Sequence, residues 1–137
     1  MRRFIILTLT LAAWAWAAPA GARCSGADPA ITKASVVSVT PSGGLNNVKV
    51  SVTVTNLGSA KQPSNTLQSV EITQNDTKVG RKGVPPLAAG QAYTFAYVFQ
   101  RSVEASPGTT PLRLQLVVTQ PSNADCDASN DVYHLRV

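Results

Sequence analysis

The chain contains few of the residue types that carry catalytic or metal chemistry. Among its 137 residues are one histidine (His134), one methionine and two cysteines. A blue-copper site needs two histidines and a cysteine, and structural zinc needs four cysteine or histidine ligands, so both are excluded. A Ser-His-Asp triad needs a base and an acid around one nucleophile, and nothing in the sequence selects a serine for His134. Catalysis is not expected, and an unrecognised secreted enzyme using His134 is only an alternative.

The N-terminal segment has the three parts of a secretory signal peptide. A start with two arginines is followed by an apolar run over residues 4–18 and a small-residue cleavage site at 20–22. The run is shorter than the roughly 20 apolar residues of a membrane-spanning helix. We therefore expect residues 1–22 to be removed. Residues 23–137 would then form one periplasmic or secreted domain without membrane insertion.

The remaining charge is modest. The formal net charge of +5 includes the two arginines of the signal segment, so the excess of basic residues in the domain is smaller. The one local basic cluster is Lys78, Arg81 and Lys82, which we interpret as a solvated hairpin. This balance favours solubility over nucleic-acid binding. The expected partner is an unidentified protein or glycan, and the expected state is a monomer.

The two cysteines, Cys24 and Cys126, lie at opposite ends of the predicted domain. An exported chain meets an oxidising compartment, where an even cysteine count indicates a disulfide. Only one intramolecular pairing is possible. The sequence therefore predicts a Cys24–Cys126 bridge, and without a C-x-x-C motif no redox activity is expected.

Alternating apolar and polar residues dominate the rest of the chain. Valines at every second position from Val48 to Val54 predict a half-buried strand, and an aromatic series from Tyr93 to Phe99 predicts another. Further short strands are predicted over 31–40, 67–73, 77–84, 112–118 and 132–137. About seven such strands, separated by turn signals, indicate an all-β antiparallel immunoglobulin-like β-sandwich. Both tryptophans belong to the signal segment, so the antibody Cys-Trp-Cys pattern is absent.

Three segments are more distinctive than this general pattern. V-K-V-S-V-T-V-T-N-L-G-S-A spans 48–60, V-P-P-L-A-A-G-Q-A-Y-T-F-A-Y-V-F spans 84–99, and an acidic, asparagine-rich stretch spans 120–131. In order and spacing they resemble a strand and turn, an L-x-x-G turn, and the last turn of CARDB domains, which are bacterial cell-adhesion-related modules. The resemblance covers residues 27–137. It implies an immunoglobulin-like sandwich in an extracytoplasmic setting and no particular reaction, because such folds host many functions.

The last of these segments departs from the family pattern. The family's paired asparagines are replaced by Asn130-Asp131, and Cys126 is inserted between Asp125 and the pair. The resemblance implies a turn-stabilising hydrogen-bond role for Asn130 and Asn123.

The same stretch also has the chemistry of a calcium site. Asp125, Asp127 and Asp131 supply hard oxygen ligands of the kind that calcium prefers. An EF-hand is excluded, because Asn130 and Arg136 stand where its glycine and glutamate would be. Asp and Asn also bond their own backbone in turns, and that interpretation is favoured. No cofactor is therefore expected, and calcium is the alternative.

The function that follows is an exported, non-catalytic binding or structural module in the periplasm or at the cell surface. Sandwich modules usually bind through end loops or strand edges. The candidate loops are 41–47, 56–65, 85–90 and 120–130, and the sequence does not choose between them. A calcium-dependent binding module using the acidic loop 123–131 is the alternative.

Overall fold

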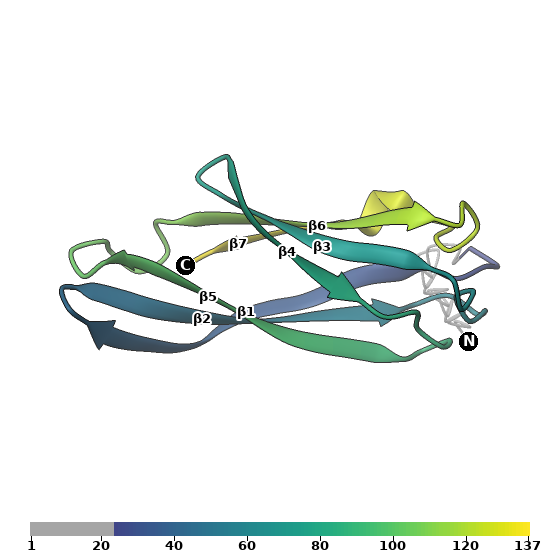
Figure 1. The fold of residues 1–137 in the computed structure, drawn as a ribbon, viewed down its shortest axis with the longest axis horizontal. Coiled ribbons are helices and arrows are strands. Elements are labelled where there is room, and N and C mark those ends of the chain that lie inside the picture. Colours follow the sequence, from purple (N-terminus) through teal and green to yellow (C-terminus); the bar gives the residue numbers. More distant parts are fainter. Residues whose placement is uncertain (1–23) are drawn as a thin grey trace, which may run out of the picture.

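The computed structural model describes residues 24–137, so the predicted signal peptide lies outside the described residues. Seven antiparallel strands form two sheets with the orders β1-β2-β5 and β4-β3-β6-β7. Figure 1 shows these sheets as two layers. The strands are β1 (Pro29–Ser42), β2 (Leu45–Asn56), β3 (Leu67–Gln74), β4 (Thr77–Val84), β5 (Ala92–Ser102), β6 (Pro111–Gln120) and β7 (Val132–Arg136). The predicted all-β sandwich is confirmed.

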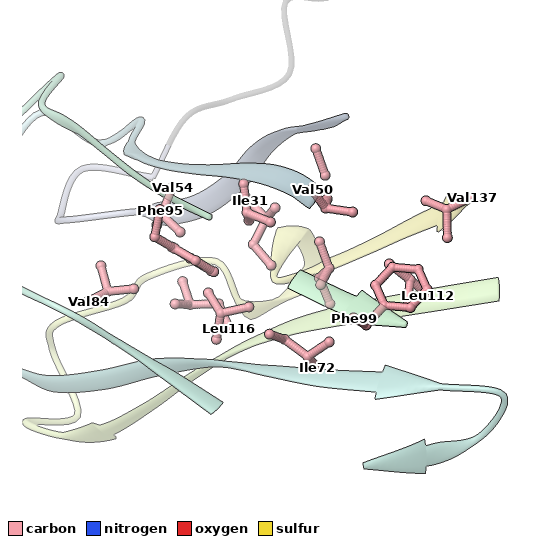
Figure 2. Packing of buried hydrophobic residues seen from close by; sticks show 14 of the residues in the cluster. Ile31, Val50, Val54, Ile72, Val84, Phe95, Phe99, Leu112, Leu116 and Val137 are labelled. Carbon is pink, nitrogen blue, oxygen red and sulfur yellow. The ribbon is translucent and has the colours of Figure 1, made fainter. Parts of the chain in front are cut away.

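The core lies between the two layers and follows the predicted alternation. All four valines of β2 from Val48 to Val54 are at most 1% exposed, because side chains at every second strand position point to one face. They pack against residues of the other sheet such as Ile72 and Leu114. Figure 2 shows this cluster drawing on both sheets. Its aromatic members, Phe95 and Phe99, come from β5 alone.

The first hairpin differs from the prediction for residues 41–47. That range was expected to be a loop, but β1 extends to Ser42 and β2 begins at Leu45. Only Gly43 and Gly44 turn, with φ of 56° and 81°, a conformation that glycine adopts without a steric penalty. Residues 41–47 are therefore a tight hairpin, and the expected loop is wrong.

The second hairpin carries the basic cluster. Asn75 and Asp76 turn it with positive φ angles of 47° and 63°, as in type I′ turns. Lys78 and Arg81 both reach Glu71 on β3, at 2.7 and 2.8 Å. Their hydrogen bonds lower the pKa of the Glu71 carboxyl. Two of the three clustered cations are therefore paired with one acid on the sheet surface.

The described chain has little helix. A three-residue 3-10 turn, Ala128–Asn130, interrupts the segment between β6 and β7. None of the helical structure in residues 24–137 is long and apolar enough to cross a membrane.

Candidate functional site at the disulfide end

Three of the four predicted loops lie at one end of the sandwich. Loop 56–65 follows β2, loop 85–90 precedes β5, and 120–130 joins β6 to β7. Backbone hydrogen bonds connect the first two to each other, and others connect loop 56–65 to residues 24–28, the lead-in before β1. Figure 1 shows the start of β1 and the β6–β7 segment together at this end, with the β1–β2 hairpin at the other. We call this group of loops the disulfide end.

The disulfide itself joins the lead-in to the β6–β7 segment. Cys24 and Cys126 are bonded, with their Cα atoms 5.9 Å apart. The Cys126 N–H donates to the Ala27 carbonyl oxygen at 2.9 Å, so backbone pairing reinforces the bridge. A Cβ added at Gly26 would lie 3.4 Å from the Cβ of Cys126, which shows how closely the lead-in packs on it. The structure thus contains the pairing that the cysteine count predicts.

Asp125 and Asp127 bond the backbone of their own turn. The Asp125 carboxylate accepts the N–H of Asp127 at 3.0 Å. The Asp127 carboxylate caps the 3-10 turn by accepting the Ser129 N–H at 3.1 Å, and it also accepts the Ser129 hydroxyl. These bonds lower the pKa of Asp127. Both residues therefore have the local turn geometry that Asp favours in loops.

The two asparagines with a proposed turn-stabilising role differ in their surroundings. The Asn130 amide donates to the Asp28 carboxylate at 2.8 Å, across 102 positions of sequence. It therefore links the last turn to the start of β1. Asn123 is exposed in the turn after β6. The contribution of either side chain to stability stays a prediction.

Asp131 is the unusual acid of this end. It is only 8% exposed, and its backbone carbonyl accepts the Leu116 N–H at 2.8 Å. Burial, followed by the charges of nearby Asp125, Asp28 and Asp127, raises the pKa of its carboxyl to about 8. The carboxyl is therefore mainly protonated at pH 7. Within residues 24–137 its Oδ1 atom is buried without a hydrogen-bond partner.

Asn56 is a central residue of this end, although the sequence indicates it only as the first residue of loop 56–65. It is 0% exposed. Its Oδ1 accepts the N–H groups of Asp28 at 2.9 Å and Gly58 at 3.1 Å. Its Nδ2 donates to the carbonyls of Ala60 at 2.9 Å and Leu87 at 3.2 Å. One amide thus satisfies four backbone groups from the lead-in and both neighbouring loops.

A buried pair of glutamine side chains at this end was also not predicted from the sequence. Gln62 and Gln68 exchange two side-chain hydrogen bonds, each 2.8 Å long. Gln62 also accepts the Leu87 N–H at 2.9 Å and donates to the Ala124 carbonyl at 3.0 Å. Strand alternation places Gln68 on the inward face with Val70, so its burial was predictable. Nothing local distinguishes Gln62 from an ordinary loop residue.

Outside this network the loops remain accessible. A cavity of about 560 Å³ opens between them, bordered by Lys61, Gln62, Pro63, Ser64, Asn65, Pro86, Leu87, Ala88 and Gln91. Its border is mostly uncharged and rich in hydrogen-bonding groups, with Lys61 as its cation. The arrangement is suited to binding a polar surface.

His134, the residue considered for catalysis, is not part of the disulfide-end loops. His134 is exposed on β7, where it lies opposite Arg113 of β6. Within residues 24–137, no three His, Cys, Asp or Glu side chains are grouped closely enough to hold a metal ion.

The two-sheet fold and its bonded loop end define an immunoglobulin-like module. The CARDB family model matches residues 30–132, and the chain belongs to that family, as its sequence motifs predicted. It also resembles the crystal structure of a CARDB domain from Pyrococcus furiosus in complex with di-metal ions. That likeness has a TM-score of 0.62 at 16% identity and covers 83% of this chain and 94% of the other. No curated protein matches the chain.

Proposed function

We propose that this protein is an exported, non-catalytic binding module that acts in the periplasm or at the cell surface. Membership in the CARDB family supports a binding or structural module rather than an enzyme. The signal-like segment 1–22 supports export. The Cys24–Cys126 disulfide supports an oxidising compartment, since such bonds are rare in reducing ones.

The binding role is supported mainly by the way in which the disulfide end is built. Asn56 and Gln62 fix the bases of loops 56–65 and 85–90 from within. The side chains at the loop tips, including Lys61 and Asn65, remain exposed around the cavity. A rigid scaffold that presents accessible polar loops is how many binding modules are built. The partner is a protein or a glycan with a polar surface.

A capture experiment with matched charge reversals tests this role. The protein would be immobilised and exposed to envelope extract, comparing the parent with Lys61→Glu and Lys49→Glu. Lys49 is exposed on β2, away from the cavity. We expect a component that is retained by the parent and by Lys49→Glu but lost with Lys61→Glu. Retention that is equal in all three proteins, or absent from all, would count against the disulfide end as the binding surface.

Calcium binding is a second candidate with its own supporting observation. The Oδ1 atoms of Asp131 and Asn130 are buried and make no hydrogen bond within the described residues. Together with Asp125 they offer oxygen ligands, and the Pyrococcus furiosus relative is described as binding two metal ions. Asp127 fits less well, since its carboxylate already caps the 3-10 turn.

Calorimetry at two pH values tests this candidate. A proton on Asp131 competes with a cation, so calcium should bind more tightly at pH 9 than at pH 6. Asp131→Asn should weaken binding, whereas Asp76→Asn in the β3–β4 turn should not. The absence of binding heat, together with an unchanged melting temperature at both pH values, would exclude a calcium-dependent module.

A further inference from the structure

The opposite end of the sandwich holds a cavity of about 500 Å³. It opens between the β1–β2 hairpin, the end of β5 and the end of the chain after β7. Val48 and Val137, both buried, belong to its wall, while Val36, Val39 and Val103 are 40–49% exposed. Val137 is also one of the labelled residues of the buried hydrophobic cluster in Figure 2. The full lining is Val36, Val39, Asn46, Val48, Arg101, Val103, Ala105, Pro107, Gly108, Arg136 and Val137.

Arg101 occupies a position in this cavity that strand alternation would give to an apolar residue. Phe95 and Phe99 are buried on the inward face of β5, and Arg101 is the next residue of that series. The β2–β5 register sets it opposite Asn46, one inward step beyond the Val48–Phe99 pair. The inward face of β5 therefore ends in a guanidinium group.

Among the residues that the structure describes, no acidic side chain forms an ion pair with the Arg101 guanidinium. Its Nε and Nη1 atoms are buried and make no hydrogen bond within residues 24–137. The ion pairs found in that range both belong to Glu71, on the other sheet. The cavity lining adds a second cation, Arg136, and has no Asp or Glu side chain. A half-buried guanidinium without an ion-pair partner favours an anionic ligand, so the charge of this site is complementary to an anion.

We propose that this cavity binds a small amphiphilic carboxylate, a single carboxylate group on an aliphatic body such as a medium-chain fatty acid. The carboxylate would pair with Arg101, because a guanidinium donates two N–H groups to one carboxylate. The aliphatic body would lie along the valines of the wall and rim. The cavity volume falls within the range of about 300 to 1,000 Å³ that is usual for small-molecule sites. This site goes beyond the binding role proposed for the disulfide end and does not rest on it.

Calorimetry and amide NMR with three probes test the proposal: decanoate below its micelle concentration, decanol and acetate. Decanoate has both the aliphatic chain and the carboxylate. Decanol has the chain without the charge, and acetate has the carboxylate without the chain. We expect saturable binding of decanoate, with amide shifts at Val103 and Val137, and binding of decanol and acetate that is at least about tenfold weaker. Equal binding of decanol would mean an apolar cavity without charge recognition. Equal binding of acetate would mean an anion site only, and either result would overturn the proposal.

Two arginine variants complete the test. Arg101→Gln should weaken decanoate binding by about tenfold or more, because it removes the charged donor. Arg113→Gln, an exposed change on β6, should leave it unchanged. Folding is checked by the dispersion of the amide spectrum, and since Arg101 is unpaired its removal should not unfold the protein. Decanoate that binds Arg101→Gln as tightly as the parent would refute the assignment, whatever the capture experiment with Lys61→Glu shows.

Discussion

Replacing Asp131 by Asn should remove most of the pH dependence of folding between pH 5 and pH 8. Asp131 is 8% exposed, and the pKa of its carboxyl is raised to about 8 by burial and by the neighbouring acids. In the unfolded chain the group would ionise near its ordinary value of 3.8. The native state therefore retains a proton that the unfolded state has lost across this range. Asn at this position is a permanently neutral group of nearly the same shape.

The sign and size of the effect follow from proton linkage. A raised pKa contributes stability that is fully present below the unfolded value and is lost as pH rises toward the folded value. One proton changes the free energy of unfolding by about 1.4 kcal/mol per pH unit. From pH 5 to pH 7 the parent should lose about 3 kcal/mol through Asp131. Glu71 and Asp127 have lowered pKa values, so their contributions change only at more acidic pH.

Urea unfolding at several pH values, with the disulfide intact, measures this slope. We expect the free energy of unfolding of Asp131→Asn to be nearly constant from pH 5 to pH 8. At pH 7 this variant should be more stable than the parent. Asp76→Asn, in the exposed β3–β4 turn, is the matched control and should retain the parent slope. A parent that is equally stable at pH 5 and pH 7, or an Asp131→Asn variant with the parent slope, would refute the reasoning.

Three further changes probe the bonds of the disulfide end by denaturant unfolding. Replacing Cys24 and Cys126 by Ser should cost up to about 4 to 5 kcal/mol, and a loss below 1 kcal/mol would show that the bridge restrains little. Asn56→Ala should cost at least about 3 kcal/mol, because four backbone groups, most of them buried, lose their hydrogen bond to its side chain, and an unchanged midpoint would contradict that network. Gly58→Ala should cost about 1 to 3 kcal/mol, since its Cβ would overlap the backbone of Gly26 and lie 2.7 Å from the Asp28 nitrogen; a neutral result would mean that the lead-in shifts freely.

The fold was predictable because its signal is local. Strict alternation in β2 and β5 sets which side chains face inward, and the sandwich buries those side chains. The Asn75-Asp76 turn and the cysteine pairing were likewise accessible, from turn chemistry and from a count of two. The strands and the turn depend on residue type and short spacing, and the disulfide depends on a count of cysteines, all of which a single sequence displays directly.

The features that were missed depend on partners distant in sequence. Register shifts in β1 between Ile31 and Lys33, and between Val36 and Ser38, disrupt its alternation and leave Val36 exposed. No residue type in β1 indicates those shifts. The raised pKa of Asp131 likewise depends mainly on burial, and to a smaller extent on charges that include Asp28, and both arise only when the chain folds. The acidic stretch 120–131 indicated which residue types could act as ligands. It did not indicate which of these side chains are buried or which are engaged in hydrogen bonds of the turn.

The two ends of the core differ in a way that bears on function. Asn56 follows Val54 on the inward face of β2, and Arg101 follows Phe99 on the inward face of β5. Each is a polar group at the end of an apolar series. The Asn56 side chain satisfies four backbone groups, whereas Arg101 leaves two buried nitrogens without a partner in the described chain.

A polar group that contributes mainly to the fold should be destabilising to remove, and one retained for a ligand should be nearly neutral to remove. We therefore expect the free energy of unfolding to fall with Asn56→Ala and to stay unchanged with Arg101→Gln, which would distinguish a structural end from a ligand-binding one. An equal fall in both variants would mean that Arg101 only stabilises the sandwich.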